Sequence, residues 1–262
     1  MESEPESRIK LTTFQNDGVF RAKRILAEHN GVLIADAVGL GKTFIGGELI
    51  REVVETKRQR ALLIAPAALR DGTWKRFRKA HQLYLEAISF EQLMNDVQLG
   101  GTGHYIEQKI RDYELVVVDE AQAFRNPQTR RGQALIKLLQ DDPPKKLVLM
   151  SATPVNNSIW DLYHLLGYFI RHDAAFAAQG IPSLKEKFRM AEGQDADDLR
   201  PESMFDVLDA TVVRRTRSFV QKFYPNDTLG GPDGIGEHYK LFSLPITGLF
   251  LNPRVDFARL AA

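Results

Sequence analysis

The sequence predicts an α/β fold, in which a parallel sheet is covered by helices. The first observation is a set of short, almost wholly apolar runs, as expected for strands that are buried on both faces. The second is that these runs alternate with longer stretches of helix-compatible composition that lack interior proline. The clear runs are residues 31–35, 61–65, 114–118 and 147–150, and residues 87–90 form a weaker candidate.

Helices are expected between these strands, at residues 43–55, 71–78, 106–111 and 131–139. From residue 159 to 224 there is no strong strand run, only helical periodicity interrupted by a polar, acidic stretch at 192–198. This part is therefore expected to be a helical appendage. Turn-forming residues gather at 225–227 and 230–234, which predicts a linker or tail beyond them.

Composition and charge exclude several classes of protein. Hydrophobic residues make up 44% and charged residues 26%, so neither a disordered nor a fibrous chain fits. The net charge of +1 means that any nucleic-acid affinity must come from local patches. The absence of cysteine excludes disulfides, thiol catalysis and cysteine-ligated metals, and the histidines show no paired ligand spacing. No apolar signal-peptide or membrane-spanning run is present, so we expect a cytoplasmic protein without a membrane partner.

A glycine-rich loop follows the first predicted strand and leads into a helical stretch. It reads Asp36-Ala37-Val38-Gly39-Leu40-Gly41-Lys42-Thr43. Phosphate groups bind where backbone N–H donors converge at a helix N-terminus, and glycine lets the backbone come close enough. Lys42 would add a positive charge, and Thr43 a ligand for Mg²⁺. Asp36 stands where the strict phosphate-loop pattern has glycine. The alternative is that the glycines serve only a tight turn into the helix.

An acidic pair, Asp119 and Glu120, follows the strand predicted at 114–118. In a nucleotide hydrolase, Asp119 would hold Mg²⁺, usually through a water, and Glu120 would orient and deprotonate the attacking water. The alternative is that both carboxylates cap the following helix. A third element, Ser151-Ala152-Thr153-Pro154, follows the strand at 147–150, and its hydroxyls could reach the acidic pair.

In this order, the three elements resemble the first ATPase lobe of superfamily 2 helicases, and within them the Swi/Snf-type DNA translocases, including bacterial members. The resemblance covers roughly residues 9–222. The matching segments are residues 11–15 (Q motif), 35–43 (motif I), 63–74 (motif Ia), 88–93 (motif Ib), 119–122 (motif II), 151–165 (motif III) and the arginine-rich 213–217. The resemblance implies a RecA-like P-loop lobe that uses ATP and Mg²⁺ and couples hydrolysis to DNA binding.

The resemblance also implies roles for single residues. Gln15 would hydrogen-bond the adenine edge, with Val38, Gly39, Leu40, Gly41, Lys42 and Thr43 around the phosphates. Gln122, Ser151, Ala152 and Thr153 would couple nucleotide state to the DNA site. Contacts to DNA, independent of its sequence and with a duplex as the expected form, are assigned to Pro66, Ala67, Arg70, Lys75, Arg125, Arg214 and Arg215. Charge clusters of this kind are as often solvated faces. Trp74 and Trp160 are expected in the core rather than stacked on bases.

Three departures from the eukaryotic remodeller pattern favour a bacterial or phage branch. They are Ala37, Gln122 and the triplet 151–153, where Glu, His and Thr-Gly-Thr are common. We expect a flexible N-terminus at 1–8, an ATP-binding lobe at 9–170, a helical extension at 171–224 and a linker or tail at 225–262.

Because few residues follow position 225, we expect that a second lobe with its arginine fingers acts with this one, either in cis or in trans. The resemblance to bacterial members also suggests a nuclease as a further partner. The isolated chain should then be nearly inactive. The alternatives are a non-hydrolysing nucleotide- or DNA-binding scaffold, and half of a split defence or restriction ATPase.

Overall fold

The protein is described by a computed structural model that covers residues 8–140, 143–156, 158–192, 202–229 and 239–240. Its centre is a six-stranded sheet in the order β3-β2-β4-β5-β1-β6, in which all neighbouring strands are parallel. The strands are β1 (Gly31–Ile34), β2 (Arg60–Ala65), β3 (Glu86–Ser89), β4 (Tyr113–Val118), β5 (Lys146–Met150) and β6 (Val212–Val213). The predicted α/β class and the first five strands are confirmed, and β6 was not predicted.

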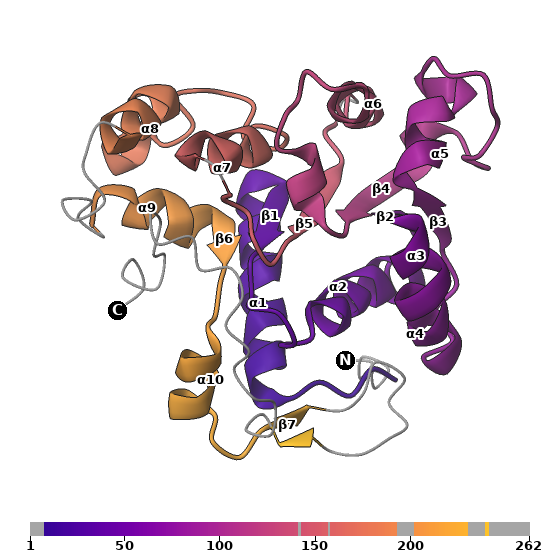
Figure 1. The fold of residues 1–262 in the computed structure, drawn as a ribbon, viewed down its shortest axis with the longest axis horizontal. Coiled ribbons are helices and arrows are strands. Elements are labelled where there is room, and N and C mark those ends of the chain that lie inside the picture. Colours follow the sequence, from indigo (N-terminus) through magenta and orange to yellow (C-terminus); the bar gives the residue numbers. More distant parts are fainter. Residues whose placement is uncertain (1–7, 141–142, 157, 193–201, 230–238, 241–262) are drawn as a thin grey trace.

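Helices cover both faces of the sheet (Figure 1). They are α1 (Thr13–His29), α2 (Lys42–Arg51), α3 (Ala67–Leu69), α4 (Lys75–Ala80), α5 (Phe90–Asn95), α6 (Arg130–Leu138), α7 (Ile159–Leu166), α8 (Leu184–Glu192), α9 (Glu202–Thr211) and α10 (Arg217–Phe223). Alternate strand residues enter different cores because side chains of a strand point to opposite faces. In β1, Val32 and Ile34 pack with α1 and α2, whereas Leu33 packs with the layer of α5 to α9.

Three of the four expected helices are confirmed. Residues 43–55 lie in α2 and the wider turn Glu52–Thr56, residues 71–78 in the continuous helical segment 67–80, and residues 131–139 in α6. The prediction of a helix at 106–111 is wrong, because this stretch forms only a 3-10 turn, at Ile110–Asp112. The buried carboxylate of Asp96 explains this, because it accepts the backbone N–H groups of Tyr105 and Ile106 (2.9 and 2.7 Å) and holds the segment as a loop.

The expected helical appendage is present as α7, α8, α9 and α10, while most of the acidic stretch at 192–198 lies outside the described residues. Between α9 and α10, the two-residue strand β6 pairs with Leu33 and Ile34 of β1. A pair of valines is too short a signal to predict a strand from sequence. This pairing brings the arginine-rich segment back beside the loop that follows β1.

The expected linker is partly structured. Asp227 accepts the backbone N–H of Phe14 at 2.8 Å, and β7 (Thr228–Leu229) pairs antiparallel with β8 (Tyr239–Lys240). The rest of the expected tail and residues 1–7 of the expected flexible N-terminus lie outside the described residues. In the part of the chain that the structure describes, no helix is long and apolar enough to cross a membrane.

Candidate functional site

The glycine-rich loop joins the carboxyl end of β1 to the first turn of α2 (Figure 1). Its two glycines have positive φ, 82° at Gly39 and 79° at Gly41, a conformation that side chains disfavour. At Gly41 a Cβ would also lie 2.4 Å from Nε2 of Gln15. Between them, Leu40 is wholly buried against α1 and α10 and anchors the loop to the core. The shape of the loop therefore depends on both glycines and on this apolar anchor.

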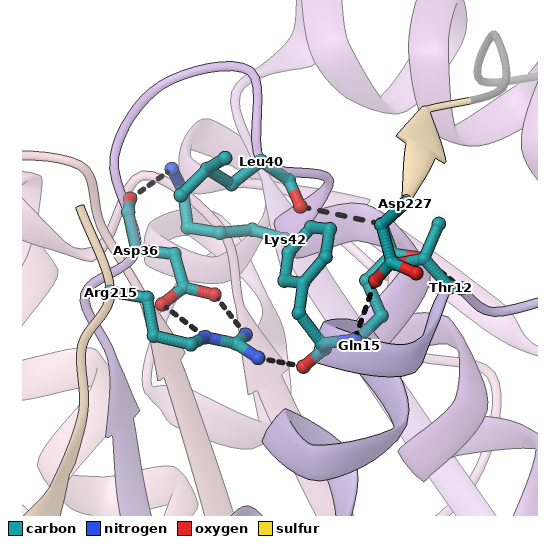
Figure 2. A network of polar contacts seen from close by, with 8 residues as sticks. Thr12, Gln15, Asp36, Leu40, Lys42, Arg215 and Asp227 are labelled. Carbon is teal, nitrogen blue, oxygen red and sulfur yellow. Dashed lines mark hydrogen bonds and ion pairs between the residues drawn. The ribbon is translucent and has the colours of Figure 1, made fainter. Parts of the chain in front are cut away.

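The loop offers hydrogen-bond donors to a ligand. Within the described residues, the backbone N–H groups of Val38, Gly39 and Gly41 have no acceptor. The Nζ of Lys42 donates to the backbone oxygen of Asp36 at 2.8 Å, so it lies folded back over the same loop (Figure 2). Free amides and an ammonium group at the start of a helix are the donor set that phosphate groups require.

Electrostatics connect this loop to the acidic pair. Burial lowers the pKa of Lys42, and the negative charges of Asp36, Asp119 and Glu120 act in the opposite direction. Both carboxylates of the pair are thus near enough to influence the ammonium group. The structure brings Lys42, Asp119 and Glu120 to one edge of the sheet, at the carboxyl ends of β1 and β4.

Asp119 is held in place by hydrogen bonds to both of its carboxylate oxygens. Oδ2 accepts the indole N–H of Trp74 at 2.8 Å, and Oδ1 accepts the backbone N–H of Glu120 at 2.9 Å. Burial raises the pKa of Asp119, whereas these two hydrogen bonds act to lower it. A buried carboxylate held in this orientation could hold Mg²⁺ through a water, and the hydroxyl of Thr43, in the first turn of α2, could supply a second ligand.

Glu120 has an unusual backbone conformation for a non-glycine residue, with φ 51° and ψ 47°. Such conformations cost energy and are common at functional sites. Glu120 precedes the 3-10 turn Ala121–Phe124, but its side chain makes no capping hydrogen bond there. The alternative of a helix-capping role is thus not supported for Glu120.

A hydrogen-bonded chain links the acidic pair to the end of β5. Nε2 of Gln122 donates to Glu120 at 2.5 Å, and Oε1 of Gln122 accepts the hydroxyl of Ser151 at 2.7 Å. Ser151 is wholly buried and also accepts the backbone N–H of Thr153 at 3.1 Å. Ala152 lies between these two residues. The segments after β4 and β5 are therefore connected by three side chains.

Gln15 is buried and bound to the protein itself. Its Oε1 accepts the backbone N–H of Thr12 at 3.1 Å in a capping box, and its Nε2 donates to the backbone oxygen of Leu40 at 3.3 Å (Figure 2). The first turn of α1 is thereby tied to the glycine-rich loop. The side chain lies beside the loop, where a bound nucleotide would come close, but its amide is engaged in this structure.

The prediction that Arg215 lies where it can contact DNA needs correction. Arg215 is buried, and its guanidinium pairs with both carboxylate oxygens of Asp36, with 3.1 Å between Nε and Oδ1 (Figure 2). It also donates to the backbone oxygen of Phe14. A buried carboxylate without a cationic partner is strongly destabilising, so Asp36 requires a partner such as Arg215 in the interior. The only sequence signal for this pair was Asp36 in place of the usual glycine.

The other DNA-contact candidates occupy two separate regions. Pro66 and Ala67 begin the helical segment after β2, and Arg70 follows, bonded to Asp71 (2.7 Å) and to the side chain of Gln92. Arg70 and the exposed Lys75 line a cavity of about 430 Å³ with Arg78 and Lys79.

The two remaining candidates follow different strands. The half-buried Arg125 follows β4, the neighbour of β2. Arg214 follows β6, at the other end of the sheet order, so the structure does not bring it together with Arg70.

The six-stranded parallel sheet and its loop-bearing edge define a RecA-like α/β lobe. The family model for the SNF2-related domain matches residues 89–229, more than half of the 262 residues, and the chain belongs to this family. The core of a SWI2/SNF2 ATPase from Sulfolobus solfataricus, solved in complex with dsDNA, superposes with a TM-score of 0.59 at 21% identity, over 83% of this chain and 47% of that chain. This likeness confirms the fold.

Relatives with similar sequences include three proteins of different origins. The DNA repair and recombination protein RAD54-like of Drosophila ananassae is 25% identical over 76% of this chain. An uncharacterized ATP-dependent helicase, YqhH of Bacillus subtilis, is 24% identical over 55%, and a SWI/SNF-related regulator of chromatin of Xenopus tropicalis is 28% identical over 58%. The chain spans 29%, 27% and 17% of the lengths of these relatives.

Proposed function

We propose that the chain is the nucleotide-binding lobe of an ATP-dependent DNA translocase, and that it corresponds to the first ATPase lobe. The observation that carries this proposal is the placement of Lys42, Asp119 and Glu120 at the carboxyl ends of the parallel strands β1 and β4, beside a loop with unused amide donors. Phosphates need the amides and the ammonium group, and a divalent cation needs the carboxylate. The family membership supports the same conclusion.

Each residue of the site has a distinct proposed role. The amides of Val38, Gly39 and Gly41 and the ammonium group of Lys42 bind the phosphates, and Lys42 has two further N–H donors beside the one bonded to the oxygen of Asp36. Thr43 and Asp119 would hold Mg²⁺, which would neutralise charge on the phosphates. Glu120 orients the attacking water and takes its proton. Gln15 reads the adenine edge through its second N–H donor and the second lone pair of Oε1, which the bonds to Leu40 and Thr12 do not use.

We propose that DNA binds at the carboxyl edge of β2 and β4 and contacts Pro66, Ala67, Arg70, Lys75 and Arg125. The cationic cavity beside Arg70 and Lys75 supports this surface, as does the dsDNA in the complex of the Sulfolobus solfataricus relative. The hydrogen bonds that link Glu120, Gln122 and Ser151 are the proposed connection through which a change of bound nucleotide alters that DNA surface. Arg214 is kept as a separate candidate contact.

Hydrolysis is proposed to need a second α/β lobe, in cis or in trans, because arginine fingers raise phosphoryl-transfer rates by about 10³ to 10⁵. The structural relative is about twice as long as the matched part of this chain, which supports an additional lobe. A bacterial or phage origin and a nuclease partner stay proposals from the resemblance. A cytoplasmic location and the division into residues 9–170, 171–224 and 225–262 stay proposals from the sequence.

The experiment that tests the site is a titration of a fluorescent ATP analogue in the presence of Mg²⁺. Lys42→Ala should abolish most of the affinity, while its circular dichroism matches that of the unchanged protein, because Lys42 contacts the loop rather than the core. Lys222→Ala, which removes a charge from α10, serves as the control. Equal affinities for Lys42→Ala and Lys222→Ala would contradict the assigned site. A phosphate-release assay with and without DNA separates a translocase lobe from a scaffold that never hydrolyses.

A further inference from the structure

The arginine-rich segment 213–217 runs alongside the start of the glycine-rich loop. The backbone N–H of Ala35 donates to Val213 at 2.8 Å, and that of Ala37 donates to Arg215 at 3.1 Å. These bonds extend the pairing of β1 with β6 beyond the strands and into the loop. Two segments that are far apart in the sequence therefore form one continuous backbone ladder next to the phosphate site.

Arg215 binds Asp36, the first residue of the loop, in the protein interior. The ion pair with Asp36 is bidentate, and the side chain of Asp36 is wholly buried. The guanidinium of Arg215 also lies 5.1 Å from the ring centroid of Phe14. Since Phe14 precedes Gln15, the same guanidinium connects the loop to the first turn of α1. Bidentate pairs of this kind fix geometry as well as charge.

Arg217 holds the loop from the outside, two residues further on. Its Nε and Nη2 both donate to the backbone oxygen of Val38, at 3.2 and 2.9 Å. The peptide bond between Val38 and Gly39 is planar and trans, so fixing its oxygen directs the N–H of Gly39 to the opposite side. Gly39 gives this peptide unusual rotational freedom. A contact on the Val38 oxygen thus controls the direction of one of the free amide donors.

We propose that Arg217 is a positioning residue for the phosphate loop, with Arg215 as its buried anchor, and that these two arginines act on nucleotide affinity rather than on DNA. The proposal rests on the proposed function, because it assumes that the loop receives phosphates. Arg217 is also the first residue of α10. Any ligand that requires the held shape of the loop therefore stabilises the start of α10, and the coupling is reciprocal.

The test compares Arg217→Ala with Lys222→Ala, which removes the same charge from α10, the same helix. Titration with a fluorescent Mg-ADP analogue should show a loss of about 10-fold or more for Arg217→Ala, the effect of a lost hydrogen bond from a charged donor, and no loss for Lys222→Ala. Without nucleotide, hydrogen exchange at amides 37–41 should become faster in Arg217→Ala only. Duplex DNA affinity should be the same in both variants.

Three results would overturn the inference. The first is unchanged Mg-ADP affinity and unchanged exchange in Arg217→Ala. The second is a loss of Mg-ADP affinity that disappears at high salt, because salt screens a long-range attraction to phosphate but not a hydrogen-bonded loop shape. The third is a loss of DNA affinity without a loss of Mg-ADP affinity. If the unchanged protein does not bind the analogue at all, the proposed function fails, and the exchange experiment still tests whether Arg217 restrains the loop.

Discussion

The indole N–H of Trp74 donates a hydrogen bond of 2.8 Å to Oδ2 of Asp119. Trp74 is wholly buried, at the end of the wide turn Arg70–Trp74, and Asp119 follows β4. The helical segment that begins at the proposed DNA surface therefore also orients the proposed magnesium ligand. Trp74 was expected to be a core residue, and this is confirmed. Its polar contact adds an orienting role at the site.

Trp74→Phe tests this orienting role, because it keeps an aromatic ring in the core and removes only the donor. Partners that orient a metal ligand typically contribute about 10-fold or more to metal affinity. We expect the Mg²⁺ concentration that half-saturates nucleotide binding to rise by about 10-fold. Trp160→Phe, at a half-buried position on α7, is the control. An unchanged Mg²⁺ requirement in Trp74→Phe would show that Asp119 needs no such orientation.

The buried pair of Asp36 and Arg215 predicts a distinct pattern of stability. Arg215→Met should lower the free energy of unfolding by about 3 to 5 kcal/mol, because it leaves a buried charge without a partner. The double variant with Asp36→Asn should be more stable than Arg215→Met alone. Arg21→Met, which removes the partly exposed pair with Asp209, should cost about 1 kcal/mol or less. Urea denaturation of the four proteins measures this, and a double variant no more stable than Arg215→Met would contradict the pairing.

Ser151→Ala tests the link between the segments after β4 and β5. The variant loses the hydroxyl that Gln122 accepts at 2.7 Å, while the phosphate loop is untouched. Mg-ATP affinity measured alone should stay within about 2-fold of the unchanged protein, since a single neutral hydrogen bond is lost away from the phosphates. The effect of duplex DNA on that affinity should shrink. Ser158→Ala, which removes the cap of α7, is the control. A DNA effect of the same size in Ser151→Ala and in the unchanged protein would exclude this route.

The strands and the strand-end motifs could be predicted because they depend on local patterns. A strand that is buried on both faces must be apolar, and ligand-binding residues of parallel sheets follow such strands. The contacts that shape the site could not be predicted in this way. Trp74 and Asp119 are 45 positions apart, and Asp36 and Arg215 are 179 apart. Charge alone does not tell whether an arginine faces solvent or a buried carboxylate, which is why Arg215 was assigned to DNA.

His29, at the end of α1, predicts how stability depends on pH. Its side chain is only 9% exposed and packs against Phe176, with 5.4 Å between the ring centroids. Burial lowers the pKa of His29, although the charge of Glu28 acts in the opposite direction. In the unfolded chain the pKa is about 6.5, so below that pH the unfolded state takes up a proton more readily than the folded state.

The contribution of neutral His29 to stability is therefore present above about pH 6.5 and is lost progressively as the pH falls below that value. His29→Gln should reduce this loss, because glutamine does not titrate. His172→Gln, at an exposed position, should leave it unchanged. Urea unfolding at about pH 7.5 and about pH 5.5, on either side of the free histidine value, measures the difference. If His29→Gln loses as much stability between the two conditions as the unchanged protein does, His29 is not the group that makes folding sensitive to acid.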